Sequence, residues 1–319
     1  METDNQNYLK ARRVLKTVAN AIVGKETVII RVLLAILARG HVLLEDIPGV
    51  GKTTLAVAFS KALGLDYNRM QFTPDILPSD VTGFSIFNKE TGCMEYTQGA
   101  IMCNLFLADE LNRATSRAQS ALLESMEEGQ VTVDGISYRI PQPFIVIATQ
   151  NPVGAAGTQL LPDSQIDRFM VCLSLGYPDH TDELSLLMRR QRGKLLDFVE
   201  PVLTSDELEL MREEVDRIYV DQEILNYIVS LVGETRRHPD ILLGASPRAT
   251  IAFVGISKAM AYLQGRDYVI PKDIIPLFAD TLAHRLILRA DAESENITSA
   301  KILDDILRTV RAPRIKKQW

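Results

Sequence analysis

The sequence predicts a three-layer α/β domain with a parallel sheet, followed by a smaller domain made only of helices. In the first half of the chain, short apolar runs alternate with helix-like patterns. These runs lack clean alternation of polar and apolar residues, which is typical of strands buried on both faces of a parallel sheet. Beyond about residue 178, nearly every pattern has helical spacing. A chain of 319 residues is long enough for two domains, at roughly 100–200 residues each.

Five segments of the first domain are strand candidates. Four are short apolar runs, and the fifth, 67–72, has a weaker pattern. The four runs are 41–45, 104–108, 144–148 and 170–175. Helix-like stretches such as 52–63 and 117–128 lie between them, so we expect helices on both faces of the sheet.

Two inserts interrupt this alternation, and both are predicted to be β-hairpins. The first, about 82–98, has two alternating arms around a turn at 88–92. The second, about 129–143, has Asp134-Gly135 at its centre, a dipeptide that favours a two-residue hairpin turn. We therefore predict a first domain over 1–178 that carries both inserts.

The predicted second domain, 179–319, is assigned from helix patterns and from their start signals. The patterns cover 182–192, 205–218, 222–236, 247–263 and 301–310. Thr204 followed by Glu207 fits a capping box, and Ser246 followed by Pro247 fits an N-cap with proline at the first helical position. Pro271 and Pro276 interrupt the stretch 268–282.

Composition and charge exclude several classes of protein. Hydrophobic residues make up 46% and charged residues 24%, which argues against a disordered or fibrous chain. The 35 basic and 41 acidic residues give a net charge of −6, which argues against a general nucleic-acid binder. Three separated cysteines support neither a disulfide framework nor a zinc site. The N-terminus is polar, and the longest apolar stretch, 28–38, is too short to span a bilayer, so we expect a soluble, cytoplasmic protein.

The strongest motif directly follows the first strand candidate. Its residues are Pro48, Gly49, Val50, Gly51, Lys52, Thr53 and Thr54. A strand, a glycine-containing turn and a helix start form a nest of backbone N–H groups that favours a polyphosphate. Lys52 is expected to reach the β- and γ-phosphates, and the Thr53 hydroxyl to bind Mg²⁺. The general pattern has a glycine where this chain has Asp46, so we expect the Asp46 side chain to point away from the phosphates.

Two carboxylates follow the strand candidate at 104–108. Asp109 and Glu110 could form the solvated start of a helix, the commoner meaning of such a pair in isolation. After a phosphate-binding loop, Asp109 is instead expected to hold the Mg²⁺ shell, and Glu110 to orient and polarise the attacking water. Glu110 points to nucleotide hydrolysis rather than to binding alone.

Three further polar residues extend this site. Asn151 follows the strand candidate at 144–148 and could bond both the γ-phosphate and the lytic water, or belong to an Asn-Pro turn. Arg168 precedes the last strand candidate, where it could be a surface ion-pair residue or could neutralise phosphate charge in the transition state. Arg248 lies on the first turn of a helix in the second domain.

These elements, in this order, resemble AAA+ ATPases of the MoxR family over nearly the whole chain, in the helix-2-insert clade that also contains RavA and magnesium-chelatase motor subunits. The motifs that carry the resemblance are 45–54, 71–80, 109–114, 121–128, 148–153, 166–169 and 283–288. The resemblance implies ATP and Mg²⁺ as cofactors, with Thr53 and Asp109 on the metal side. It also implies a hexameric ring with nucleotide at the subunit interfaces.

The same resemblance implies roles for individual residues. Asn151 would be sensor 1, Arg168 the arginine finger of a neighbour's site, and Arg248 sensor 2, acting on its own or a neighbour's nucleotide. Val23 and Gly24 match the segment that lies beside the adenine in the family. The two hairpins match the helix-2 insert and the hairpin before sensor 1.

We therefore expect a Mg²⁺-dependent ATPase that remodels other proteins, in a chaperone-like, maturation or metal-insertion role. The family is typically linked to partners with von Willebrand factor A domains. A magnesium-chelatase-like motor subunit and a nucleotide-switched scaffold with little turnover are the alternatives. A helicase is disfavoured because the hairpins offer mainly Lys89 and Arg139 as basic residues. Neither nucleic-acid binding nor direct membrane insertion is expected.

Overall fold

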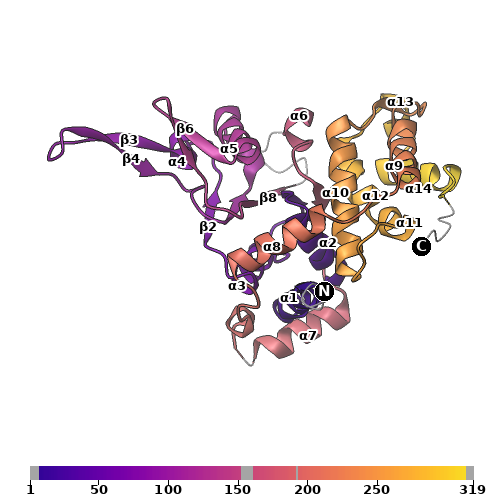
Figure 1. Ribbon diagram of the computed structural model, residues 1–319, viewed down its shortest axis with the longest axis horizontal. Helices are drawn as coiled ribbons and strands as arrows, with labels where there is room; N and C mark the ends of the chain where they lie inside the picture. Colours follow the sequence, from indigo (N-terminus) through magenta and orange to yellow (C-terminus); the bar gives the residue numbers. More distant parts are fainter. Residues whose placement is uncertain (1–6, 152–160, 192, 314–319) are drawn as a thin grey trace.

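A five-stranded parallel sheet lies at the centre of the first half of the chain (Figure 1). The structure is a computed structural model that describes residues 7–151, 161–191 and 193–313, so the Pro152-Val153 end of the motif at 148–153 lies outside the described residues. The strands are β1 (Val42–Glu45), β2 (Tyr67–Gln71), β5 (Leu105–Asp109), β8 (Ile145–Gln150) and β9 (Val171–Leu173). Their order is β2-β5-β8-β1-β9, and every neighbouring pair is parallel. The predicted α/β fold class is confirmed.

Burial explains why one strand had a weaker pattern than the others. Every residue of β5 and β8 is buried, which matches their continuous apolar sequences. In contrast, β2 is an edge strand that pairs only with β5, and its residues Asn68, Arg69 and Gln71 are exposed. An edge strand needs less apolar surface, so polar residues interrupt its sequence.

The two faces of the sheet belong to two separate buried clusters. Alternate residues of the central strands, such as Leu107 and Ile147, pack with α1 (Asn7–Ala21), α2 (Glu26–Leu37) and α3 (Lys52–Ala62). That cluster continues into the C-terminal helices. The opposite set, which includes Phe106 and Val146, packs with α5 (Ser116–Glu128) and with α4 (Pro78–Thr82). The helical part of the chain therefore shares a core with one face of the sheet.

Two antiparallel hairpins extend from the second face. The first pairs β3 (Gly83–Asn88) with β4 (Cys93–Gln98) and projects far from the body of the molecule (Figure 1). The second pairs β6 (Gln130–Val133) with β7 (Ile136–Arg139). Asp134 and Gly135 both have positive φ (50° and 79°), as a two-residue hairpin turn of the I′ kind requires.

The C-terminal part is mainly helical. Its longer helices are α7 (His180–Arg190), α8 (Ser205–Asp216), α9 (Gln222–Thr235), α10 (Pro247–Leu263) and α14 (Ser299–Thr309). The shorter elements of this part and of the segment before β9 are α6 (Asp163–Ile166), η2 (Leu195–Phe198), α11 (Pro271–Ile274), η3 (Ile275–Leu277), α12 (Phe278–Leu282), η4 (Ala283–Arg285) and α13 (Ala290–Ser294). One small sheet of β10 (Ile241–Leu243) and β11 (Ile287–Leu288) corrects the expectation of helices alone.

The predicted helix starts and interruptions follow from local chemistry. The Thr204 hydroxyl accepts the Glu207 N–H, and the Glu207 carboxylate accepts the Thr204 N–H, which completes the capping box. The Ser246 hydroxyl caps α10. Pro276 lies in η3, so the stretch after Pro271 forms three short elements instead of one helix. Among the described helices, none combines the length and the apolar character needed to cross a bilayer.

Asp46 connects the end of β1 to the segment that follows β9. It is 5% exposed, and its carboxylate accepts hydrogen bonds from the Ser174 hydroxyl (2.9 Å) and from the backbone N–H groups of Leu175 and Gly176. The side chain therefore points away from the loop that follows it, as expected. Asp46, the residue that departs from the general loop pattern, therefore holds the segment that directly follows β9.

We expect Asp46→Ala to lower the free energy of unfolding by about 1–3 kcal/mol, because it leaves two backbone N–H groups without their acceptor. Urea denaturation measures the stability, and hydrogen exchange measures the amides of Leu175 and Gly176, which should exchange faster. Asp75→Ala, at an exposed carboxylate, is the control. Unchanged exchange at 175 and 176 would show that Asp46 does not hold this segment.

His41 links the sheet to α5 and favours its neutral form. Its Nδ1 accepts the Val146 N–H (3.0 Å), so Nε2 carries the proton and lies 3.3 Å from the Met126 carbonyl. Burial lowers the pKa of His41 to about 4. Protonation of Nδ1 would place two N–H groups against each other.

Acid should therefore destabilise the protein through His41. As pH falls below about 6.5, His41 becomes protonated in the unfolded chain but stays neutral in the native state. The free energy of unfolding therefore decreases between pH 6.5 and about 4, and His41 has no such effect above that range. We expect the stability difference between wild type and His41→Asn to shrink by about 1–3 kcal/mol from pH 7 to 4.5 in urea titrations. His180→Asn, at an exposed histidine, is the control, and a difference independent of pH would contradict this role.

Candidate nucleotide-binding site

The loop between β1 and α3 has a backbone suited to an anion. Gly49 and Gly51 have φ of 88° and 102°, a region that side chains rarely adopt, and a Cβ at either position would meet no other atom within 4 Å. Gly51 is the N-cap of α3, so the free N–H groups of the first helical turn face the loop. A helix start behind an open glycine turn is a fitting place for phosphate.

Lys52 lies at the base of this loop. It is 7% exposed, and its Nζ donates to the Asp46 carbonyl (2.6 Å) and to Asn151 Oδ1 (3.4 Å). Burial lowers the pKa of Lys52, while the carboxylates of Asp46, Asp109 and Glu110 oppose that shift. The ammonium group is thus held beside three negative charges at the loop that would receive a polyphosphate.

Asp109 ends β5 and has partners on both carboxylate oxygens. Oδ1 accepts the Thr149 hydroxyl (2.6 Å) from the neighbouring strand β8. Oδ2 accepts two bonds from the Arg69 guanidinium, from Nε (3.2 Å) and from Nη2 (2.7 Å). The strands on either side of β5 therefore orient this carboxylate, and Arg69 forms an ion pair with it.

Glu110 follows in a strained conformation. Its φ of 57° lies in the left-handed region, and its backbone N–H donates to the Thr149 hydroxyl (2.8 Å). The carboxylate accepts from Arg113 (2.7 Å), from the Asn151 amide (3.3 Å) and from Gln71 (3.5 Å). The hydrogen bond from Arg113 is the main reason why the pKa of Glu110 is lowered, so the carboxylate is ionised at neutral pH.

Asn151 bridges the lysine and the glutamate. Its Oδ1 accepts from Lys52 and its Nδ2 donates to Glu110. Its backbone is fixed by Asn112 in η1 (Leu111–Arg113), whose side chain accepts the Asn151 N–H (3.4 Å) and donates to the Asn151 carbonyl (3.2 Å). The asparagine therefore has little freedom to turn away from the two charged groups.

These residues surround a cleft of about 340 Å³. Its lining combines the loop with the ends of β2, β5 and β8: Pro48, Gly49, Gly51, Lys52, Thr53, Thr54, Arg69, Gln71, Asp109, Glu110 and Asn151. The Thr53 hydroxyl and the Asp109 carboxylate share this cleft, and hard oxygen donors of this kind suit Mg²⁺. The predicted loop, carboxylates and asparagine thus meet at one place.

A larger cleft of about 1060 Å³ adjoins the first on the other side of the loop. Both are lined by Pro48, Gly49, Gly51 and Thr54, and the larger one is also lined by Val50, Val23, Tyr177 and residues of α7 and η2. Gly24 is absent from its lining. This residue packs against α7, where a Cβ would lie 1.8 Å from the Asp182 carboxylate.

Arg168 and Arg248 are not brought to either cleft. They lie beside a third cavity of about 240 Å³, where both pair with one carboxylate. Glu127 Oε2 lies 3.2 Å from Arg168 Nη2, and Glu127 Oε1 accepts from Arg248. Glu127, an exposed residue of α5, therefore joins Arg168 to Arg248 at the start of α10.

Sequence reasoning did not find the arginines that partner the two site carboxylates. Arg69 lies on β2, next to β5 in the sheet, and Arg113 lies one helical turn after Glu110. The available signal for Arg69 was its place near the carboxyl end of a strand, the edge of a parallel sheet where ligand sites form. The spacing from Glu110 to Arg113 was the signal for the second pair.

Comparison with known proteins agrees with this architecture. Residues 41–171 match the family model described as "ATPase family associated with various cellular activities (AAA)", and residues 233–306 match the AAA lid domain. The structure is similar to the crystal structure of a protein from Cytophaga hutchinsonii described as an ATPase. The TM-score is 0.90 and the identity 39%, over 98% of both chains.

Several relatives match the chain over most of its length. The chain is 46% identical to YeaC of Bacillus subtilis over 94% of both chains. It is 35% identical to the protein named Chaperone MoxR1 of Mycobacterium tuberculosis, over 95% of this chain and 82% of that one. Identity to Protein MoxR of Methylorubrum extorquens is 31%, over 94% and 93% of the two chains. The chain is therefore a member of the MoxR family of AAA+ ATPases.

Proposed function

We propose that this protein hydrolyses ATP with Mg²⁺ in an oligomeric ring and uses the energy to remodel partner proteins. The observation that carries the proposal is the convergence of Lys52, Asp109, Glu110 and Asn151 on one cleft beside an open glycine loop. A lysine, two carboxylates and an amide around an anion-binding helix start are the parts that phosphoryl transfer to water requires.

The chain's own groups would divide the work as follows. The N–H groups of the loop from Pro48 to Thr54 hold the phosphates, and Lys52 neutralises the β- and γ-phosphates. Thr53 and Asp109 would hold the metal ion, which would supply positive charge at the transferring phosphate. Glu110 orients a water molecule and accepts its proton, while Asn151 keeps that carboxylate in line with the phosphate held by Lys52.

The position of Arg168 and Arg248 supports action on a neighbouring subunit's nucleotide. Both side chains pair with Glu127 beside a cavity that, among the described residues, shares no lining residue with the two nucleotide clefts. An arginine outside its own site can stabilise transition-state charge only in another subunit. We therefore propose a hexameric ring in which both arginines act in trans, and a division of each chain near residue 178.

The client-binding surface and the partner protein are further parts of the proposal. The β3–β4 hairpin extends from the body and exposes Phe84, Ile86, Phe87 and Met94, which is surface suited to contact with another protein. We propose a cytoplasmic partner with a von Willebrand factor A domain and a chaperone-like or maturation role. The hairpin carries Lys89 as its single basic residue beside these apolar side chains, which favours a protein client over nucleic acid.

A magnesium-chelatase-like motor is the second candidate. The chain is 28% identical to a protein named Magnesium-chelatase subunit ChlI-1 of Arabidopsis thaliana, over 70% of this chain and 51% of that one. Metal insertion into a partner or its cofactor would use the same ATPase site.

Two substitutions in the cleft separate nucleotide binding from turnover. Lys52→Ala should lose both, because it removes the cation at the phosphates. Glu110→Gln should keep ATP binding and lower kcat by about 10²–10⁴, because an amide cannot accept the proton of water. Binding of a fluorescent ATP analogue and phosphate release measure the two effects. Glu124→Gln, at an exposed carboxylate of α5, is the matched control, and full turnover by Glu110→Gln would exclude Glu110 from catalysis.

Mixtures of subunits test whether Arg168 acts on a neighbouring subunit's nucleotide. Arg168→Ala alone should lose about 10³-fold or more in kcat. Mixed with Lys52→Ala subunits, which bind no ATP but carry an intact Arg168, the Arg168→Ala subunits should regain hydrolysis. Steady-state phosphate release across mixing ratios measures the rescue. A mixture as inactive as its components would argue against an arginine that acts in trans.

A further inference from the structure

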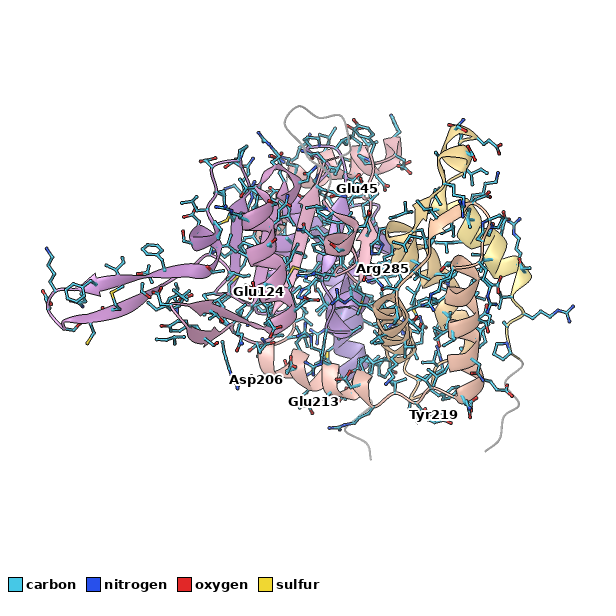
Figure 2. All side chains as sticks on the ribbon, turned by 90° about the horizontal axis from the view of Figure 1, so that it is seen from above. Glu45, Glu124, Asp206, Glu213, Tyr219 and Arg285 are labelled. Atoms are coloured by element: carbon cyan, nitrogen blue, oxygen red, sulfur yellow. The ribbon has the colours of Figure 1, made fainter. Side chains whose placement is uncertain are left out.

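A buried arginine from the helical part of the chain holds the turn that carries Arg168. Arg285, in η4, has a side chain that is 2% exposed. Its Nη2 donates to the carbonyls of Phe169 (2.6 Å) and Asp167 (3.1 Å), the residues on either side of Arg168. Its Nε lies 3.4 Å from the Asp167 carboxylate. Figure 2 shows Arg285 between the sheet and the C-terminal helices.

The Asp167 carboxylate has a second partner that leads to Arg248. The Ser246 hydroxyl lies 3.1 Å and 3.0 Å from the two Asp167 oxygens, and the same hydroxyl accepts the Ala249 N–H as the N-cap of α10. Arg248 is in the first turn of that helix. One carboxylate therefore joins the turn of Arg168 to the helix start that carries Arg248.

The desolvation cost of burying the Arg285 guanidinium indicates that this side chain does more than fill space. A guanidinium removed from water is expensive unless its donors are satisfied, and an apolar side chain of similar volume is often as stable. Among the described residues, Arg285 Nη1 is buried without a hydrogen-bond partner. What the buried fork provides, and an apolar residue cannot, is a fixed geometry for two carbonyls and a carboxylate at once.

The backbone N–H groups of this turn, from Asp167 to Met170, each have a carbonyl partner. What Arg285 adds is a tie from the helical part of the chain to the carbonyls of the turn. Helix α6 ends at Ile166 after four residues, and β9 begins at Val171. Arg168 Nε is itself buried without a partner among the described residues, so this side chain depends on its backbone and on Glu127 for its direction. Arg285 supplies bonds to the carbonyls that flank it.

We propose that Arg285 is a positioning residue that fixes Arg168 in the direction needed to reach a neighbouring subunit's nucleotide, and that Ser246 ties Arg248 to the same carboxylate. The proposal rests on the proposed trans role of Arg168. It assigns a function to the conspicuous Ala283–Arg285 segment, which the nucleotide clefts do not use. The helical part of each subunit then controls the arginines that the subunit offers to its neighbour.

The test uses two variants of Arg285. Arg285→Lys keeps the charge but loses the planar guanidinium with its several donors. Arg285→Met removes the buried charge and serves if the lysine variant folds poorly. Alone, each should lower kcat about 100-fold, the effect of a small displacement of a catalytic group, with ATP affinity within about twofold of wild type. Arg212→Lys is the matched control, since Arg212 is also a buried arginine that donates to a carbonyl, that of Ile36.

Mixtures of subunits distinguish positioning in trans from a structural defect. Arg285→Lys mixed with Lys52→Ala should regain hydrolysis, because the Lys52→Ala subunits present a well-placed Arg168 to intact nucleotide clefts. Arg285→Lys mixed with Arg168→Ala should stay inactive, because neither subunit offers a well-placed arginine. Arg212→Lys should hydrolyse ATP in either mixture.

Different failures would have different meanings. Hydrolysis by the mixture of Arg285→Lys with Arg168→Ala would show that Arg285 does not position Arg168, and so would a loss of ATP affinity by both Arg285 variants. If Arg168→Ala is not rescued by Lys52→Ala, the trans role itself is wrong, and the Arg285 proposal falls with it.

Discussion

The parallel order of β5, β8 and β1 is the constraint on which the site depends. Parallel strands bring their carboxyl ends to one edge, so the loop after β1, the carboxylates after β5 and the asparagine after β8 meet although they are far apart in sequence. Complete burial of β5 and β8 fixes their register, and a shift of one residue would turn the Asp109 side chain to the other face. The apolar core thus sets the geometry of the polar edge.

Charge pairing then keeps the polar edge in order. Arg69 pairs with Asp109, Arg113 with Glu110, and both Arg168 and Arg248 with Glu127. Each arginine places an opposite charge beside its carboxylate, and the hydrogen bond from Arg113 is the main cause of the lowered pKa of Glu110. Lys52 differs from these arginines, since it is already held by a carbonyl and an amide at the place where phosphates would lie.

The helical part of the chain is more than a cover for the sheet. It shares a hydrophobic core with one face of the sheet, its α7 and η2 line the larger cleft, and its Arg285 holds the turn before β9. Asp46 adds a polar tie between the end of β1 and the segment that leads to α7. A movement of these helices would therefore change both the shape of the larger cleft and the positions of Arg168 and Arg248.

The sequence by itself determined the strands, the glycine loop, the hairpins, the helix caps and the residue types that face the cleft, because these depend on local periodicity and turn chemistry. The pair of Glu110 and Arg113 is local, but only the tertiary structure decided the counter-charges that come from distant parts of the chain. Arg69 meets Asp109 across 40 residues, and Arg285 meets Asp167 across 118. No local pattern encodes such pairs, because they depend on how whole elements pack. Glu127 of α5 shows the same dependence on packing, because its two arginines come from the turn before β9 and from the start of α10.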